Sequence, residues 1–266
     1  MRTVSIVFVL LTYRNEKDLI DFLNSAREKV EDYVAVVVNS YYDDESLEKI
    51  KKVAEEYECH FINIENKGYG YGNNQGVSYA NAHFDYQYLI VSNPDIIIKN
   101  YSKDFLQGME KAVVAPRIEN AKGNMQNPMV WKKSKLAESL VYTGLKNDNK
   151  LLLYMGMGIN KVIRILFLLT HRRDQVVQVY QAHGSFIIFS KYVLAQIGLP
   201  FDEQIFLFAE EGDLAAILNK KGLPIYYVPS IVLFHKEDGS MQFREDLDQR
   251  LVSANVYVYE KHHKKD

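Results

Sequence analysis

The chain has 266 residues, of which 47% are hydrophobic and 25% are charged, as in a soluble globular protein rather than a fibrous or disordered one. Its formal net charge of −2 gives no general attraction to nucleic acid, so we expect no nucleic-acid partner. The length allows one large domain or two small ones.

The first hundred residues alternate between strand and helix patterns. Nearly continuous apolar runs rich in β-branched residues predict strands that are buried on both faces, and the segments between them carry apolar residues at helical spacing. We expect strands over 3–12, 32–39, 60–65 and 88–98, and helices over 13–30, 44–58 and 77–83. This alternation is typical of a parallel, doubly wound α/β sheet.

Residues 66–95 carry the strongest signal for a binding site. The segment 66–76, NKGYGYGNNQG, is predicted to be a loop whose glycines let the backbone approach a ligand. The strand that follows carries one carboxylate, Asp95, to its C-terminal edge, where open α/β sheets bind ligands. These features predict a site for a phosphorylated metabolite. Because the loop follows the third strand and lacks a Lys-Ser/Thr ending, it matches neither a dinucleotide fingerprint nor a P-loop.

Residues 119–150 are polar and contain the turn signals AKGN and KNDN, which predict a variable, partly mobile insertion. Trp131, the only tryptophan, lies in this insertion. Two roles stay open for it, a stacking residue for a ligand and an ordinary packing aromatic, and we favour the second.

Residues 151–170 form the most apolar segment of the chain. Charges at Lys161 and Arg164 interrupt it, so we do not expect it to span a bilayer. Two interpretations stay open. It is either an amphipathic helix in the membrane interface, with Lys161, Arg164, Arg172 and Arg173 facing lipid phosphates, or a core helix with a basic cap, which the sequence slightly favours.

The last third of the chain returns to regular elements. We expect a strand and a short helix around Gly184 and Ser185, and a further strand that ends at His235. Between them, three carboxylates begin a helix that ends near residue 222: Glu210, Glu211 and Asp213. A helix N-terminus favours negative charge, so these acids also have an ordinary explanation as caps.

The tail and the single cysteine carry weaker signals. The tail is predicted to be helical or frayed, with His262 and His263 solvated. Cys59 is predicted to be a small buried residue, because no base that could activate the thiol is evident. One cysteine cannot form an internal disulfide and the N-terminus shows no cleavage-site pattern, so we expect a cytoplasmic location.

Seven ordered motifs resemble those of a known family. They are TYRN, VVVNSYYDDES, NKGYGYGNNQG, SNPD, AHGS, FDEQIFLFAEEGDL and FHKEDGS. Over residues 3–240 they resemble the bacterial family 2 glycosyltransferases, particularly the rhamnosyltransferase-like branch. The resemblance implies a single α/β domain of the glycosyltransferase A type, with a mostly parallel, doubly wound (Rossmann-like) central sheet flanked by helices and a helical or irregular insertion around 119–175. It assigns 1–100 to nucleotide-sugar binding, 101–240 to acceptor binding and catalysis, and 241–266 to a helical tail.

The resemblance also implies a nucleotide-diphosphate sugar donor, such as dTDP-rhamnose or a UDP-sugar, and a divalent metal, Mg or Mn. By similarity, Asp95 would be the direct metal ligand and His235 would complete the metal or diphosphate site. Asn39 stands where the family commonly has an aspartate that bonds the base, and its amide changes the donor and acceptor pattern. The residues that the resemblance places at the donor are Thr12, Tyr13, Asn15, Asn39, Asn66, Gly68, Asn73, Asn74, Gly76 and Asn93.

The same resemblance suggests how the reaction would run. Glu211 aligns with the family's catalytic aspartate and is the first choice for the general base, with Glu210 in reserve. Gly184 and Ser185 would form part of the acceptor wall. The implied activity is inverting, metal-dependent transfer to a saccharide or lipid-linked acceptor in cell-surface polysaccharide biosynthesis, in the cytoplasm or at the inner face of the membrane.

Two alternatives to this activity stay open. One is a sugar-nucleotide-binding protein that has lost transferase activity, which the departures at Asn39 and Glu211 suggest. The other is a nucleotidyltransferase. It should carry a basic Gly-rich loop directly after the first strand, and TYRNE is not such a loop.

Overall fold

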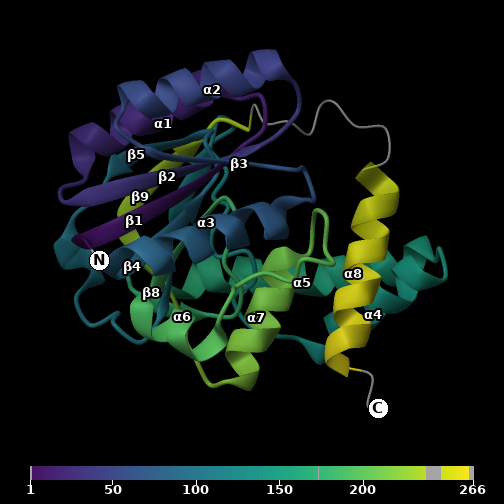
Figure 1. The fold of residues 1–266 in the computed structure, drawn as a ribbon. Helices are drawn as coiled ribbons and strands as arrows, with labels where there is room; N and C mark the ends of the chain where they lie inside the picture. The colour runs from purple at the N-terminus through teal and green to yellow at the C-terminus, as the bar shows by residue number, and fades with distance from the viewer. Residues whose placement is uncertain (1, 173, 238–246, 264–266) are drawn as a thin grey trace.

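A computed structural model of the chain describes residues 2–172, 174–237 and 247–263. Its strands form one sheet in the order β3-β2-β1-β4-β8-β6-β9-β5, with β7 paired to β9. Helices cover both faces of this sheet, and a group formed by α4, α5 and α8 stands beside it (Figure 1). The predicted α/β fold with a mostly parallel central sheet is confirmed.

The N-terminal half follows the predicted alternation. It comprises β1 (Arg2–Thr12), α1 (Glu16–Lys29), β2 (Tyr33–Ser40), α2 (Asp44–Glu56), β3 (His60–Ile64), α3 (Tyr69–His83) and β4 (Phe84–Ser92). β1 lies between β2 and β4 and runs parallel to both. Its side chains alternate between two cores, because Phe8 packs toward α1 and α2 whereas Val9 packs toward α3.

The C-terminal half completes the sheet with mixed strand directions. It contains β5 (Ile96–Asn100), a short 3₁₀ helix (Lys103–Leu106), β6 (Val113–Asn120), β7 (Val177–Val179), β8 (Phe186–Ser190) and β9 (Ile225–His235). β8 pairs antiparallel with β4 and with β6, whereas β6 and β9 are parallel. The single strand predicted over 88–98 is wrong: β4 ends at Ser92, and the SNPD turn reverses the chain into β5, which pairs with β9 at the other end of the sheet order.

The segment 66–76 corrects a second prediction, because most of it is helical rather than a loop. α3 begins at Tyr69, and its glycines Gly72 and Gly76 lie against the sheet. A Cβ at Gly76 would lie 2.3 Å from a methyl carbon of Val9 and 2.9 Å from one of Val38. Close packing of the helix on β1 and β2 therefore outweighs the low helix propensity of glycine.

Helices α4 (Lys135–Lys146) and α5 (Lys150–Thr170) form an antiparallel hairpin within the predicted insertion, after an irregular stretch over 121–134. The core-helix interpretation of 151–170 is wrong, because only Gly156 and Phe167 of α5 are buried. Trp131 packs against the end of this helix, with its ring 5.4 Å from that of Phe167. Trp131 is thus a packing aromatic. Arg173 lies outside the described residues.

The remaining helices are α6 (Lys191–Ile197), α7 (Glu210–Lys220) and α8 (Leu247–His263), and α8 packs on α4 and α7. The predicted solvation of the histidine pair is wrong for His262, whose side chain is only 5% exposed and whose Nε2 lies 2.6 Å from Asp213 Oδ1. Lys261 reaches the same carboxylate, with Nζ 2.8 Å from Asp213 Oδ1. The tail therefore fastens α8 to α7. Residues 238–240 of the motif FHKEDGS and residues 241–246 and 264–266 of the tail lie outside the described residues.

Cys59 is partly buried beside the core that α1 and α2 cover. Burial raises the pKa of its thiol to about 12, so the sulfur stays protonated and unreactive at neutral pH. This agrees with the structural role predicted for it.

Candidate active site

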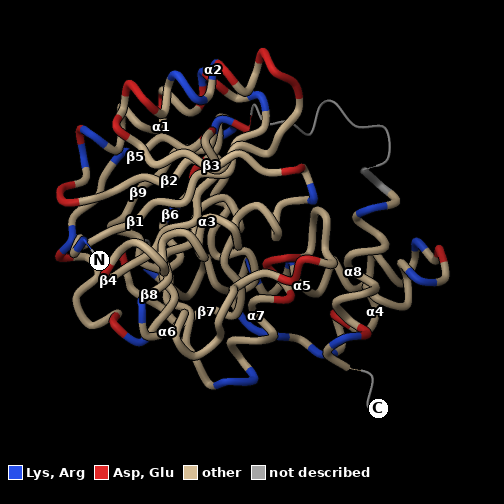
Figure 2. Tube along the Cα trace, in the orientation of Figure 1, with Lys and Arg blue, Asp and Glu red and all other residues tan. Residues whose placement is uncertain are grey.

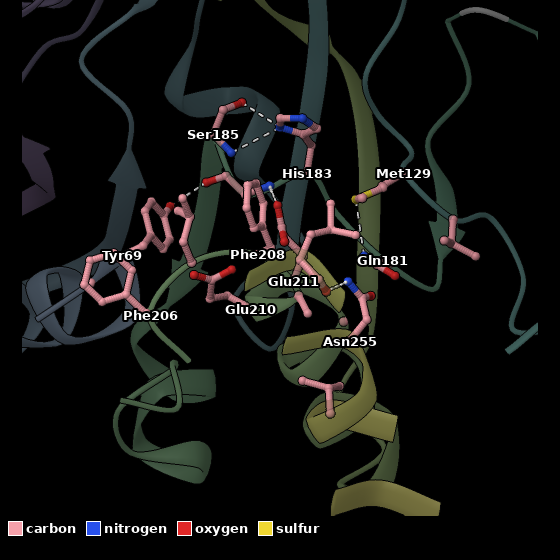
Figure 3. A pocket seen from close by; sticks show the side chains of 18 of the residues that line it. Tyr69, Met129, Gln181, His183, Ser185, Phe206, Phe208, Glu210, Glu211 and Asn255 are labelled. Atoms are coloured by element: carbon pink, nitrogen blue, oxygen red, sulfur yellow. Dashed lines mark hydrogen bonds between the residues drawn. The ribbon is translucent and has the colours of Figure 1, made fainter. Parts of the chain in front are cut away.

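A cavity of about 840 Å³ lies where the ends of β1 and β4 meet the start of α7, and its walls come from four parts of the chain. The first strands and the start of α3 supply Tyr13, Asn15, Ser40, Asn66, Gly68 and Tyr69. The turns at 93–95 and 183–185 supply Asn93, Asp95, His183, Gly184 and Ser185, and α7 supplies Glu210 and Glu211 (Figure 3). Helices α4 and α8 close the far side with largely apolar side chains, among them Val141, Leu145, Leu251 and Val258.

Five of the ten predicted donor residues line this cavity, and the other five do not. The lining residues are Tyr13, Asn15, Asn66, Gly68 and Asn93. Thr12, Asn39, Asn73 and Asn74 are buried, and Gly76 is covered by Val9 and Val38. All ten donor assignments stay predictions.

Two of the buried asparagines, Asn39 and Asn74, bond to other segments of the fold. Asn39 Nδ2 donates to Asn63 Oδ1 at 2.8 Å, across the β2–β3 pair. Asn74 Nδ2 donates to the carbonyl of Phe201 at 2.8 Å, and its Oδ1 accepts from the Phe201 N–H at 3.2 Å. Asn74 thereby ties α3 to the segment that leads into α7, a positional role that the sequence pattern did not distinguish from ligand binding.

Gly68 lies against Phe206, in the segment that leads into α7. Its φ of +107° is open to glycine but strained for other residues, and a Cβ there would lie 2.3 Å from the Phe206 carbonyl oxygen. The next residue, Tyr69, donates its N–H to that carbonyl at 2.8 Å and its hydroxyl to the Gly184 carbonyl at 2.8 Å. The start of α3 is therefore fixed to two further segments that line the cavity.

Asp95 and His235 form a buried polar pair beside the cavity. Asp95 lies in the turn between β4 and β5 and is 4% exposed, and His235 ends β9. His235 Nε2 lies 3.3 Å from Asp95 Oδ2, whereas Asp95 Oδ1 is buried and has no hydrogen-bond partner within residues 2–172, 174–237 and 247–263. A buried carboxylate oxygen without a partner is costly, unless a ligand supplies the missing interaction.

The neighbours of His235 fix where its ring carries a proton. Gln126 Nε2 donates to Glu237 Oε1 at 2.8 Å, which sets the orientation of the Gln126 amide. Gln126 Oε1 lies 2.8 Å from His235 Nδ1, so Nδ1 must carry the proton that forms this hydrogen bond. In the neutral ring, the lone pair of Nε2 then points toward the Asp95 carboxylate. An outer hydrogen bond that orients a histidine in this way is typical of metal ligands.

The pair therefore fits a divalent cation, which would take the free Asp95 oxygen and His235 Nε2 as ligands. Within the described residues no group of three or more His, Cys, Asp or Glu side chains could hold a metal on its own. Mg²⁺ usually keeps water and substrate phosphate oxygens among its ligands, so two protein ligands can suffice when a diphosphate is bound.

Glu210 and Glu211 begin α7 directly after a strained turn. Phe208 and Ala209 have φ values of 73° and 65°, in the left-handed region that residues other than glycine seldom adopt. Such strain persists where the surrounding structure enforces it, commonly at functional sites. Glu211 points toward the 183–185 turn, and its Oε1 accepts a hydrogen bond from the Gly184 N–H at 3.1 Å (Figure 3).

The two glutamates differ in their surroundings. Burial, reinforced by the neighbouring charge of Glu211, raises the pKa of Glu210 to about 8, and its buried Oε1 has no hydrogen-bond partner in the described part of the chain. Burial also raises the pKa of Glu211, but the hydrogen bond from Gly184 favours its charged form. At neutral pH Glu210 is therefore mainly protonated, and Glu211 is the better supported of the two as the carboxylate that accepts a proton.

Asp213 lies one turn further along α7 and is 1% exposed. Its two oxygens are occupied by Lys261 and His262 of α8. This arrangement agrees with the structural role expected of Asp213, and it fixes α8 against the helix that carries the glutamates.

The sequence interpretation missed several residues that shape the site. His183 lies in the quoted AHGS motif. Burial lowers the pKa of its ring to about 4, so it stays neutral and accepts the Ser185 N–H at its Nδ1, 3.2 Å away. Gln126 and Glu237 orient His235, and Asn255 of α8 lines the cavity. Gln126 comes from the polar insertion, where no motif marks it.

Comparisons with known proteins found a matching family and a related protein. The family model described as glycosyl transferase family 2 matches residues 7–164. The low-salt glycan biosynthesis hexosyltransferase Agl10 of Haloferax volcanii is 24% identical over 259 residues, which are 93% of this chain and 74% of that protein.

Solved structures share the fold at low sequence identity. GalNAc-T7, crystallised with UDP, GalNAc and Mn²⁺, superposes with a TM-score of 0.65 at 11% identity, over 97% of this chain and 48% of its own. S. aureus TarS gives a TM-score of 0.58 at 15% identity, over 98% of this chain and 40% of its own. A 1–349 fragment of TarS in complex with UDP gives the same TM-score and identity, with 67% of that fragment covered. This chain thus spans about half or less of the length of the GalNAc-T7 and TarS chains.

Proposed function

Because the chain belongs to glycosyl transferase family 2, we propose that it transfers a sugar from a nucleotide-diphosphate sugar to an acceptor hydroxyl, with inversion at the anomeric carbon. One observation carries the proposal. A single cavity holds the Asp95–His235 pair, suited to a cation and a diphosphate, together with the Glu211 carboxylate, suited to accept a proton. Inverting transfer needs both chemistries at one bound donor.

In the proposed reaction Glu211 acts as the general base. The acceptor hydroxyl gives its proton to the Glu211 carboxylate as its oxygen bonds to the anomeric carbon. The bond from that carbon to the diphosphate breaks on the opposite face, so the nucleoside diphosphate leaves with the electron pair and the configuration inverts. A divalent cation at Asp95 and His235 would supply charge neutralisation for the departing diphosphate.

Other residues of the cavity would orient the reactants. The Gly184 N–H holds one oxygen of Glu211, which leaves the other oxygen to face the acceptor. Protonated Glu210 would add no second negative charge beside the base at neutral pH. Tyr13 and Asn15, at the end of β1, would contact the nucleotide.

The finer identity of the substrates is part of the proposal. The donor would be a UDP-sugar or dTDP-rhamnose, as the rhamnosyltransferase-like motifs suggest, and two of the similar structures were solved with UDP. The acceptor would be a saccharide or a lipid-linked saccharide in cell-surface polysaccharide synthesis, with the protein in the cytoplasm. The apolar wall of α4 and α8 would suit an acceptor with an apolar part.

A donor screen by thermal shift tests this function. Because a ligand that binds only the folded state stabilises it, the correct nucleotide-diphosphate sugar at 100 times its Kd should raise stability by about 2.7 kcal/mol. The screen compares UDP-, dTDP- and GDP-sugars with and without manganese, and each ligand that shifts Tm is then assayed for release of the nucleoside diphosphate. Absence of any shift across the panel would contradict a nucleotide-sugar site.

The same screen separates the proposal from its rivals. A shift without transfer or hydrolysis under any condition would favour a sugar-nucleotide-binding protein without catalysis. Formation of a nucleotide sugar from a nucleoside triphosphate and a sugar phosphate would favour a nucleotidyltransferase. Release of the diphosphate with transfer to an acceptor supports the proposed activity.

Gly184→Ala should lower activity while preserving the fold. A Cβ at Gly184 would lie 2.6 Å from Glu211 Oε1, and this flexible carboxylate can move aside without disturbing the backbone. Displacement of a general base by about 1 Å can cost up to about 100-fold, so we expect kcat to fall by about 10- to 100-fold with little change in Tm. Steady-state kinetics and a thermal melt measure both effects.

Gly158→Ala is the matched control for this substitution. Gly158 is on α5, and a Cβ there would meet nothing within 4 Å. This variant should keep wild-type kcat. Equal activity of the two variants would show that Gly184 does not set the position of Glu211.

A further inference from the structure

Helix α5 presents an exposed apolar face along its whole length. Leu151, Met155, Val162, Ile165 and Leu169 recur at helical spacing and project from one side of the helix. Their exposed fractions range from 45% to 77%. At 1.5 Å per residue the helix is about 31 Å long. The face is therefore a continuous apolar patch, unlike the isolated apolar residues that are common on protein surfaces.

The opposite side of α5 is fixed to the body of the protein. Phe167 is buried in the core, where its ring lies 5.4 Å from that of Trp131 and 6.2 Å from that of Tyr227. The Arg164 guanidinium donates a hydrogen bond to the Met125 carbonyl, and α5 packs along α4. The helix has the length and composition to cross a membrane, but these contacts hold it against the protein surface.

The charges around the exposed face are positive. Beside this face α5 carries Lys150 and Lys161, whereas its third charged residue, Arg164, lies on the side bonded to the body of the protein; the helix contains no Asp or Glu. At the C-terminal end, Lys132 Nζ lies 4.5 Å from the centre of the Trp131 ring, which itself contacts His171. The nearest acids in sequence lie beyond both helix ends, at Asp148 and Asp174, and Asp174 pairs with Arg172. By contrast, Figure 2 shows acidic and basic residues interspersed along α1 and α2.

We propose that this face of α5 docks on an anionic lipid bilayer, with the helix lying in the plane of the interface. An apolar face with basic residues around it is the pattern of such helices, which bury the apolar side among the acyl chains and place Lys and Arg at lipid phosphates. The proposal goes beyond sugar transfer, since binding to lipid requires neither donor nor acceptor.

A second copy of the chain fits this face less well. In a two-fold symmetric pair the same patch meets itself, so the positive charges of both α5 helices would approach each other with no acid on the helix to offset them. Anionic lipid phosphates complement those charges instead.

Docking through α5 would place the candidate active site next to the membrane. Asn160 of α5 lines the large cavity, and Arg164 lines a neighbouring hollow that shares Gln126, Met129 and His183 with it. An acceptor held in the membrane by a lipid would then reach the cavity along the helix that binds the bilayer.

Vesicle flotation of the full chain tests the proposal. We expect the protein to float with vesicles made of equal parts phosphatidylcholine and phosphatidylglycerol, and far less with phosphatidylcholine alone or at high salt. Ile165→Gln combined with Leu169→Gln should lower the bound fraction by about tenfold or more, because each loses burial of a large apolar side chain. Lys161→Gln should weaken binding to the anionic vesicles only.

Matched substitutions away from α5 are the controls. Leu199 is as exposed as Ile165, at 45%, but lies after α6, so Leu199→Gln should float like the wild type. Lys51→Gln, on exposed α2, controls for the loss of one positive charge. Failure of the wild type to float, or equal flotation of the α5 and Leu199 variants, would overturn the proposal. A dimer seen by sedimentation that is lost in the α5 variant, without vesicle binding, would assign the face to a second copy.

Discussion

Glu211→Gln is expected to lower kcat by about 10²- to 10⁴-fold, which is the usual contribution of a general base. The amide keeps the size of the side chain and can still accept the Gly184 N–H, but it cannot take a proton from the acceptor hydroxyl. Burial already raises the pKa of Glu211, so a neutral side chain at this position should not destabilise the fold. Steady-state kinetics should therefore show a lower kcat with little change in the donor KM and Tm.

Glu210→Gln is the matched comparison, and its main effect should be on stability. The pKa of Glu210 is about 8 in the folded protein against an ordinary value of 4.5, so between these values the folded state holds a proton that the unfolded chain releases. The stability contributed by this group is fully present below pH 4.5 and falls as pH rises toward 8. The glutamine variant should lack this fall, which thermal melts from pH 5 to 9 would reveal.

The kinetic comparison of the two variants decides their roles. We expect Glu210→Gln to reduce kcat far less than Glu211→Gln, since burial and the neighbouring charge of Glu211 keep Glu210 mainly protonated at neutral pH. A larger loss of kcat in Glu210→Gln would make Glu210 the base. Equal, small losses in both variants would exclude a glutamate base and favour a binding protein without catalysis.

The sequence predicted the N-terminal half of the fold well because burial on both faces of a parallel sheet leaves a clear pattern. β1 is apolar at nearly every position, and both of its faces are buried, so the run itself marks a central strand. The short strands were harder. β4 and β5 read as one apolar run, and only the SNPD turn, which the Asn-Pro pair could have signalled, divides them.

The site could be predicted as a set of motifs, but not as a set of contacts. Asp95, His235 and Glu211, which the motifs contain, line one cavity. Their positions at strand and helix ends favour this arrangement. The partners that define their chemistry come from distant segments: Gln126 sets the His235 tautomer, and Gly184 holds Glu211. A sequence pattern carries no information on such pairings when the partner is a common residue in an irregular segment or a backbone N–H.

Two misjudged segments have the same physical origin. The glycines of α3 suggested a loop, and the apolar character of α5 suggested a core helix, because local propensity and hydropathy were the only guides. In the structure, packing on β1 and β2 makes the first helical, and α5 leaves its most apolar face uncovered. Tertiary contacts decide both cases.

Asp95→Asn is expected to abolish metal-dependent activity, with a loss of more than about 100-fold in kcat/KM, while the fold stays intact. Loss of the negative charge removes the strongest protein ligand of the proposed cation. Even the loss of a residue that only hydrogen-bonds to a metal ligand typically lowers metal affinity or activity by about 10- to 100-fold. Because Asp95 Oδ1 has no partner among the residues that the structure describes, the neutral amide should cost little stability. Activity titrated against manganese, direct manganese binding and a thermal melt measure these three quantities.

Gln126→Ala provides a graded comparison for the same site. It removes the amide oxygen that holds the proton on His235 Nδ1 but leaves both proposed ligands in place, so manganese affinity should fall by about 10- to 100-fold and high manganese should restore activity. High manganese should not rescue Asp95→Asn, because this variant loses a proposed metal ligand itself, whereas Gln126→Ala loses only the group that orients one. Unchanged manganese dependence in Asp95→Asn would remove Asp95 from the metal site, and would leave His235 and the substrate diphosphate as the candidates for holding the cation.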